Sequence, residues 1–244
     1  MPAKRESIFK DIDVRKLDTH TTAVGELAFG YITEPSTEYD EKGQYFLKLR
    51  FPAESKEAKR LIKIIDDAAQ QAYDMAMERI ESAAERKKLK RADPSYSMEE
   101  DEDGNETGNV LFNFKRKAVR VDKKGNEKPV TLRLFDSINR PVEQEGLELW
   151  GGSEIAVAFK LVPFYTPGVG VGVSHRIEAI QIIKAVAGGD GRTAEQFGFQ
   201  KHEGFVGGDS AVKSDETDDD DEELDEEPDN DGIAEAAGDD GGDY

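Results

Sequence analysis

The sequence contains no cysteine, only three histidines and one tryptophan among 244 residues. Without cysteine, the chain can form neither a disulfide nor a thiolate metal site. The histidines (His20, His175 and His202) lie far apart, so we interpret them as surface or packing residues. There is also no N-terminal apolar run of signal-peptide length and no stretch near the ~20 apolar residues that span a bilayer. We therefore expect a cytoplasmic protein with no metal, no cofactor and no membrane partner.

Catalytic motifs are missing as well. The stretch Gly168–Gly172 is glycine-rich but lacks the Gly-Lys-Ser/Thr of a phosphate loop, and a strand approached closely by another backbone explains it better. The acidic stretch Glu99–Gly108 does not fit a calcium loop, because its glycine is fourth from Asp101 instead of sixth and the twelfth residue is Phe112 instead of Glu. We interpret it as a solvated loop. The sequence thus predicts a protein that is not an enzyme; a catalytic site without a recognisable motif is the alternative.

Negative charge is abundant but confined to one end of the chain. The last 36 residues, Asp209–Tyr244, hold 18 acids and one base, Lys213, which gives a net charge of −17. Because the whole chain carries −20, residues 1–208 carry only −3. With two leucine-class residues, Leu224 and Ile233, this segment cannot offset the entropy of ordering. We predict a disordered acidic tail that ends in a single aromatic ring.

Hydrophobic periodicity predicts a mostly β domain with one long amphipathic helix. Residues 44–51 alternate with a strict period of two, as in a half-buried strand. A helix follows, with Ser55 as its N-cap and apolar residues at helical spacing to about Lys90. The remaining expectations are strands at 26–33, 155–162 and 169–184, a turn at 163–168, and a hairpin joining 110–121 to 130–136 with a bulge near Arg116–Lys117. This pattern favours an OB-fold, a five-stranded Greek-key barrel, with a β-sandwich as the alternative.

We accordingly divide the chain into four parts. An N-terminal arm covers residues 1–22, and the OB-fold domain covers residues 23–187, with the helix at about 55–90 and the acidic loop at about 99–108. A linker rich in Gly and Phe covers residues 188–208, and the acidic tail covers residues 209–244.

An aromatic ring beside cations recurs on the outward side of the predicted strands. Phe46 alternates with Lys48 and Arg50, and Phe135 with Arg133, while residues 110–140 carry nine bases and three acids. Single-stranded nucleic acid requires both groups, because bases stack on rings at ~1–3 kcal/mol each and cations follow the phosphates. We predict a sequence-independent single-stranded DNA-binding face. Its predicted members are Phe46, Lys48, Arg50, Lys115, Arg116, Arg120, Lys123, Lys124, Arg133, Phe135, Phe164 and Tyr165.

Each of these groups also has an alternative role. Phe46 could pack under the helix, Phe135 could belong to a second core layer, and Phe164 with Tyr165 could close one end of the barrel. We interpret Trp150 as a core or interface residue instead of a stacking platform. The cations could form an ordinary solvated face, although few acids interleave with them.

The tail also has more than one interpretation. A polyanion tethered to the domain would compete with DNA phosphates for a basic face. Acidic tails can instead be merely solubilising. A third possibility is an acidic DNA mimic or histone-like chaperone that acts through the tail itself.

One run of residues resembles a known family. It begins with Gly151-Gly152-Ser153, continues through the alternating strand from Glu154, reaches Leu161-Val162-Pro163-Phe164-Tyr165 and ends at Gly168-Val169-Gly170. Together with the acidic tail, this run resembles the single-stranded DNA-binding proteins of T7-like bacteriophages. The family has a similar glycine-serine entry and a Leu-Val-Pro followed by an aromatic. Here Thr166 stands where the family pattern has a second aromatic, and the tail ends in Tyr244 where the family usually has Phe.

The resemblance implies properties that the residues alone do not predict. It implies an OB-fold body, DNA stacking on the aromatic after Pro163, a homodimer, and a role in phage DNA replication and recombination inside the host bacterial cytoplasm. It also implies that the tail recruits the phage DNA polymerase and helicase–primase. The predicted partner-binding residues of the tail are Asp239, Asp240, Asp243 and Tyr244.

Overall fold

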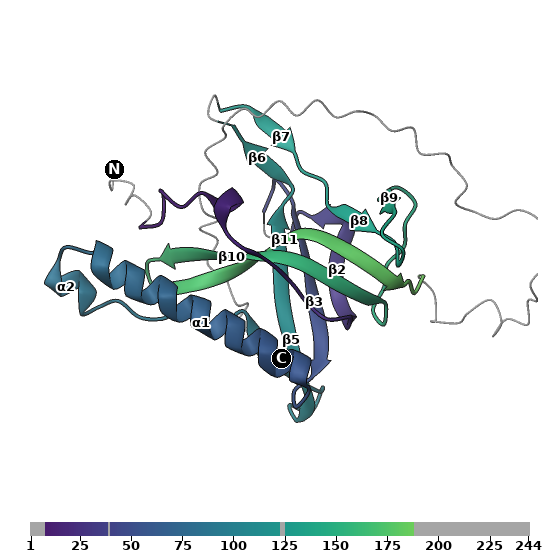
Figure 1. The fold of residues 1–244 in the computed structure, drawn as a ribbon, viewed down its shortest axis with the longest axis horizontal. Helices are drawn as coiled ribbons and strands as arrows, with labels where there is room; N and C mark the ends of the chain where they lie inside the picture. Colours follow the sequence, from purple (N-terminus) through teal and green to yellow (C-terminus); the bar gives the residue numbers. More distant parts are fainter. Residues whose placement is uncertain (1–7, 39, 123–124, 188–244) are drawn as a thin grey trace, which may run out of the picture.

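The computed structural model describes residues 8–38, 40–122 and 125–187, and its centre is a five-stranded barrel (Figure 1). The strands pair in the order β2-β3-β5-β11-β10, and β10 returns to β2 at Glu26 and Gly25. All pairs are antiparallel except β5 with β11. The predicted mostly β, OB-type barrel is therefore confirmed. The barrel strands are β2 (Gly25–Ser36), β3 (Gln44–Pro52), β5 (Glu106–Lys117), β10 (Glu154–Thr166) and β11 (Gly170–Lys184).

The other elements are short, with one exception, the helix α1. They are η1 (Val14–Lys16), β1 (Thr19–Thr21), α1 (Lys56–Arg79), α2 (Ala83–Arg86), β4 (Tyr96–Glu100), β6 (Val119–Val121), β7 (Glu127–Pro129), β8 (Arg133–Phe135) and β9 (Pro141–Val142). Within the three described ranges, no helix is both long and apolar enough to cross a bilayer.

Strand β3 confirms the period-two prediction. Tyr45, Leu47, Leu49 and Phe51 are buried in the barrel core, while the residues between them are half-buried or exposed. Since successive side chains of a strand point to opposite faces, the core side fixes which residues face outward.

Helix α1 is shorter than the sequence suggested. Ser55 caps it as predicted, with its hydroxyl accepting the Ala58 N–H, and the helix packs against β10 and β11. It ends at Arg79, about eleven residues before Lys90, and Ser82 starts the separate helix α2 by accepting the Glu85 N–H. The helical pattern of apolar residues continues across this break, so periodicity alone could not locate it.

The prediction that residues 1–22 form an arm is wrong for residues 8–22. Phe9 is completely buried, and β1 pairs with β10. Arg79 at the end of α1 donates to the Ile8 carbonyl at 2.8 Å and to the carboxylate of Asp11 at 2.6 Å. The segment is mostly polar and of mixed charge, so its sequence does not indicate packing. Its few apolar side chains, such as Phe9 and Val14, are nevertheless buried.

The predicted hairpin between 110–121 and 130–136 forms only at its tip. β5 stops at Lys117, after which Ala118 is buried and donates its N–H to the Gly43 carbonyl. β6 and β7 then pair as a separate two-stranded sheet that stands away from the barrel (Figure 1). β8 does not return to β5 but pairs in parallel with β11. The change of apolar phase near Arg116–Lys117 therefore marks the end of a strand instead of a bulge.

Two acidic or glycine-rich stretches have clear local explanations. The residues expected as an acidic loop form the β4–β5 hairpin, in which the Asp101 carboxylate accepts the N–H groups of Asp103 and Asn105. At Gly170, φ is +122° and a Cβ would lie 2.5 Å from the Lys90 carbonyl oxygen. The predicted close backbone approach is thus confirmed.

Candidate nucleic-acid interface

Three aromatic rings cluster on the outer side of β2 and β3. The ring centroids of Phe29 and Tyr31 are 5.6 Å apart, and Phe46 lies 5.6 Å from Phe29 and 5.3 Å from Tyr31. Phe29 is 51% exposed and Tyr31 is 40% exposed, whereas Phe46 is half-buried. The cluster therefore offers flat apolar surface to solvent beside β3 and β5, the second and third strands of the barrel, whose face binds oligonucleotides in OB-folds.

A bulge in β2 creates this cluster. Leu27 is buried and pairs with Leu49, but the next pair along the ladder joins Phe29 to Lys48, so that Ala28 has no partner in this pairing. The extra residue reverses the alternation, because Phe29 and Tyr31 would otherwise share the core side with Leu27. Sequence reasoning predicted the strand but missed both rings, since nothing in the residue pattern reveals the bulge.

Cations continue the face on the neighbouring strands. In the ladders, Tyr31 lies opposite Phe46, Phe46 opposite Lys115, and Lys115 opposite Arg176 on β11. Two rings and two cations thus form one row across four strands. Lys48, which is exposed, lies beside this row and opposite Phe29. We refer to Phe29, Tyr31, Phe46, Lys48, Lys115 and Arg176 as the aromatic–cation face.

Arg50 lies on the same side of β3 but is already bound by two carboxylates. Its guanidinium donates to Glu26 on β2 and to Glu99 on β4, with Nε 2.8 Å from Glu99 Oε1. The hydrogen bond from Arg50 holds the pKa of Glu99 below its usual range. Two carboxylates therefore bind the one guanidinium at this end of the face. Arg50, a predicted DNA contact, differs in this respect from Lys48, which is exposed.

Arg116 does not face the same way as its neighbour Lys115. It lies on the side of β5 that carries Phe114, and it donates to the Ile177 carbonyl at 2.8 Å and to Glu178 at 3.3 Å. Arg176 lies 3.5 Å from the same Glu178 oxygen, so Arg116 sits at the junction of β5 and β11, beside the aromatic–cation face.

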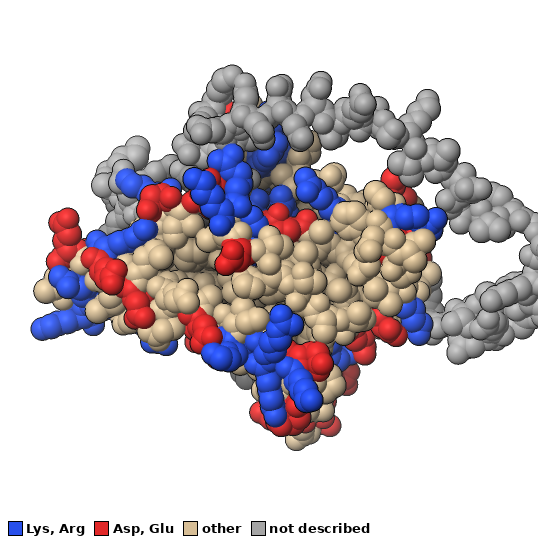
Figure 2. All heavy atoms as spheres, viewed as in Figure 1, with Lys and Arg blue, Asp and Glu red and all other residues tan. Residues whose placement is uncertain are grey.

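The remaining predicted cations lie beyond the row. Arg120 is exposed on β6, and Lys123 and Lys124 lie outside the described residues. Figure 2 shows Lys and Arg side chains gathered near the β6–β7 hairpin. Arg133 and Phe135 on β8 lie opposite Ala179 and Gln181 of β11, with Arg133 exposed and Phe135 half-buried.

Two of the predicted stacking rings are not on this face. Phe164 is only 6% exposed, and it belongs to β10 instead of the expected turn, which is limited to residues 167–169. Its ring covers Gly172, where a Cβ would lie 2.9 Å from Phe164 Cζ. Tyr165 is half-buried and packs against the core. Because strand pairing continues past Pro163, the apparent turn aromatics become packing residues in this chain.

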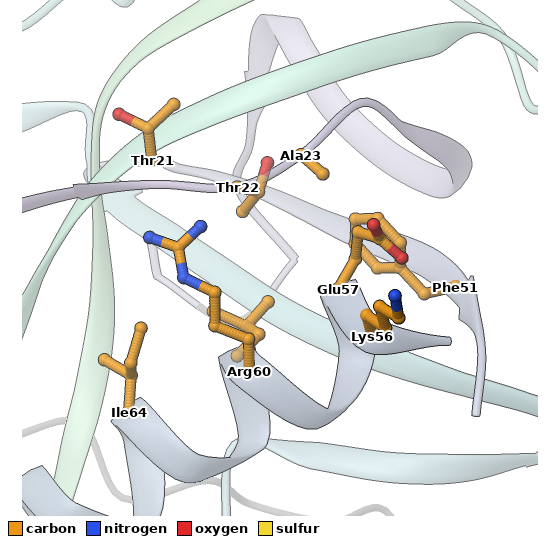
Figure 3. Close-up of a pocket in the computed structure, with 9 residues that line it drawn as sticks. Thr21, Thr22, Ala23, Phe51, Lys56, Glu57, Arg60 and Ile64 are labelled. Carbon is orange, nitrogen blue, oxygen red and sulfur yellow. The ribbon is translucent and has the colours of Figure 1, made fainter. Parts of the chain in front are cut away.

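A separate hollow lies between the segment Thr21–Ala23 and the first turns of α1 (Figure 3). Figure 3 shows the Arg60 side chain pointing toward Thr21 and Thr22, with Lys56 at one side. No residue of the aromatic–cation face lines it. This hollow is therefore separate from the candidate interface.

The strand order is that of the OB-fold class of barrels, and the outer side of this barrel carries aromatic rings beside cations. The predicted tail residues (Asp239, Asp240, Asp243 and Tyr244) lie outside the described residues.

Residues 25–185 match the model of a family described as single-stranded DNA-binding protein, bacteriophage T7. The chain belongs to this family, so the predicted resemblance is confirmed. Because it is a family of DNA-binding proteins, the prediction that the chain is not an enzyme is also confirmed.

Individual proteins are similar to the chain in sequence and in fold. The chain is 24% identical over 226 residues to the single-stranded DNA-binding protein of Enterobacteria phage T3, covering 88% of this chain and 97% of that protein. The fold is similar to the crystal structure of gp2.5, a single-stranded DNA-binding protein encoded by bacteriophage T7, with a TM-score of 0.60 and 24% identity. That match covers 78% of this chain and 98% of the other.

Proposed function

We propose that the protein binds single-stranded DNA without regard to sequence, along the aromatic–cation face. The observation that carries this proposal is the cross-strand row Tyr31, Phe46, Lys115 and Arg176. Bases stack on the rings of β2 and β3, and phosphates pass the cations of β3, β5 and β11. Stacking tolerates any base because every base has a π-face, so the interface needs no base-specific hydrogen bonds.

The acidic tail extends this proposal. A flexible chain of 36 residues has a root-mean-square reach of roughly 30–36 Å, and self-repulsion lengthens it. Tethering raises its local concentration to the order of millimolar, so the tail competes with DNA for the cations. DNA then displaces the tail and makes it available to other proteins. By family resemblance these are the phage DNA polymerase and helicase–primase, in replication and recombination, and the protein acts as a homodimer.

The test is a titration with labelled oligo(dT) at several salt concentrations, using the full-length protein and a variant that ends at Gly208. We expect both to bind, with the shorter protein binding more tightly. The logarithm of affinity should fall with the logarithm of salt concentration by about 0.7 per phosphate neutralised. Loss of all binding in the shorter protein would contradict the proposal and would favour a function carried by the tail alone.

Deletion of Tyr244 tests the tail separately. If the terminal ring contacts a partner, binding to the polymerase should weaken while affinity for oligo(dT) stays the same. Sedimentation of the full-length protein over a range of concentrations tests the homodimer. A single species of monomer mass throughout would exclude it.

A further inference from the structure

The single tryptophan of the chain is on the surface. Trp150 is 57% exposed, so of its two interpretations, core or interface, the structure excludes the core. Leu147 and Leu149 of the same segment pack against the core, while Glu148 and Trp150 are exposed. An exposed ring of this size is available for burial against a ligand, and tryptophan is enriched at interfaces because one part of the side chain is apolar and another meets water.

The backbone around Trp150 is held firmly. Its N–H donates to the Val186 carbonyl at 3.0 Å, and its carbonyl accepts the Ser153 N–H at 3.1 Å. Ser153 is completely buried, and its hydroxyl accepts the Val186 N–H at 2.9 Å. The indole is therefore presented on an ordered turn, which lowers the entropy lost when a ligand binds it.

This turn lies along the edge of β2 that does not face β3. The Gly152 N–H donates to the Leu27 carbonyl at 2.8 Å, and Gln144 Nε2 donates to the Ile32 carbonyl at 3.0 Å. Between these two contacts, β2 carries the exposed rings of Phe29 and Tyr31. The turn that carries Trp150 is therefore bonded to the edge of β2 opposite β3, which is the far side of β2 from Lys115 and Arg176.

We propose that Trp150 is an additional base-stacking residue that extends the single-stranded DNA path across the edge of β2. The inference rests on the proposed function. The strand passes from the cations of β5 and β11 over the rings of β3 and β2 to the indole. Single-stranded DNA is favoured over a protein partner because β2, to which this turn is bonded, itself carries two exposed aromatic rings, and successive bases can stack on successive rings.

The position of the tryptophan allows a direct test in the full-length protein. Because Trp150 is the only tryptophan, intrinsic indole fluorescence reports this site alone. Oligo(dT) is added while indole fluorescence is recorded, and the anisotropy of a labelled oligo(dT) measures binding independently. We expect the indole to be quenched in step with the anisotropy rise. Trp150→Ala should weaken binding about 5- to 150-fold, and Trp150→Phe should retain most of the affinity.

Met98→Ala is the matched control, because Met98 is 39% exposed on β4, beyond β5 from the aromatic rings, and should leave affinity unchanged. Binding by anisotropy without quenching, together with unchanged affinity of Trp150→Ala, would overturn the role of Trp150 and leave the proposed function intact. A change in sedimenting mass of Trp150→Ala with unchanged affinity would likewise overturn it, in favour of a protein contact. No anisotropy change with any variant would instead refute the proposed function.

Discussion

Tyr31 and Phe46 lie directly opposite each other in the β2–β3 ladder, with ring centroids 5.3 Å apart and ring planes inclined by 49°. Such cross-strand aromatic pairs stabilise a sheet, but both rings stand on its outer side, where they contribute no burial in the barrel core. The pair continues along the ladders into Lys115 and Arg176, and Arg176 also pairs with Glu178 at 3.5 Å. In the proposed function, a base stacks on this pair of rings while its phosphate lies near Lys115.

The first prediction concerns Phe46. Replacement by Ala removes the central ring of the cluster, and we expect a loss of ~1–3 kcal/mol in affinity for oligo(dT). Phe46→Tyr retains the ring and should retain the affinity. Anisotropy titrations measure both variants, and thermal melting monitored by circular dichroism confirms that they are folded. Equal affinity of the Ala variant and the parent protein would remove Phe46 from the interface.

Phe164 should behave in the opposite way. Its ring is buried over Gly172, so Phe164→Ala leaves a cavity, and we expect the free energy of unfolding to fall by about 3–5 kcal/mol. The folded fraction should bind oligo(dT) as tightly as the parent protein. Urea unfolding and an anisotropy titration below the melting temperature separate the two effects. A stable variant with weakened binding would restore the stacking role that family resemblance implied.

Gly30 tests how closely β2 approaches β3. A Cβ at this position would lie 2.8 Å from the Phe46 carbonyl oxygen and 2.9 Å from Leu47 Cα. Because both contacts involve backbone, Gly30→Ala should lower the free energy of unfolding by ~1–3 kcal/mol. Gly151→Ala is a milder comparison, since its Cβ would lie 3.1 Å from the Ala28 carbonyl oxygen. Urea denaturation of the two variants should rank them in this order, and equal stabilities would argue against the backbone clash.

The contrast between β3 and β2 shows how much of the site the sequence could predict. In β3 the ladder is regular, so alternation alone located Phe46, Lys48 and the core residues between them. In β2 the unpaired Ala28 reverses the faces, and the same reasoning would place Phe29 in the core. A bulge depends on how two strands meet, which no local pattern encodes.

Other differences arise from tertiary contacts as well. Arg50 has the pattern of an outward cation, yet Glu99 comes to it from a strand 49 residues further along the chain. Phe9 lies in a polar segment and Phe164 in a segment with the residue types of a turn, so neither sequence pattern predicts burial. Both rings are buried by contacts that form only in the folded domain. Fold class and the outward side of β3 were therefore predictable, whereas ion-pair partners and isolated packing residues were not.

The ion pair between Arg50 and Glu99 leads to a further prediction. Glu99 occupies hydrogen-bonding sites of the guanidinium that a phosphate could use, so Glu99→Gln should raise affinity for oligo(dT). We expect a gain of about 1.5- to 5-fold, equivalent to ~0.2–1 kcal/mol for a partly exposed pair. Glu102→Gln makes the same change of charge in the exposed turn between β4 and β5, and this variant serves as the control. Equal gains in both variants would show a general charge effect and not release of Arg50.

The last prediction concerns the pH dependence of stability. His175 is buried between the rings of Phe114 and Phe159, at centroid distances of 5.3 and 5.8 Å, and burial lowers its pKa from 6.5 to about 4. Between pH 6.5 and pH 4, the imidazole of the unfolded chain binds a proton that the buried imidazole does not. The free energy of unfolding is therefore highest above pH 6.5 and decreases as the pH falls toward 4. The full loss is roughly 3 kcal/mol. His175→Leu keeps an apolar side chain in the same space but cannot titrate, so its free energy of unfolding should vary less between pH 4.5 and 6.5. Urea unfolding across this range measures both proteins, and parallel pH profiles would show that other groups cause the dependence.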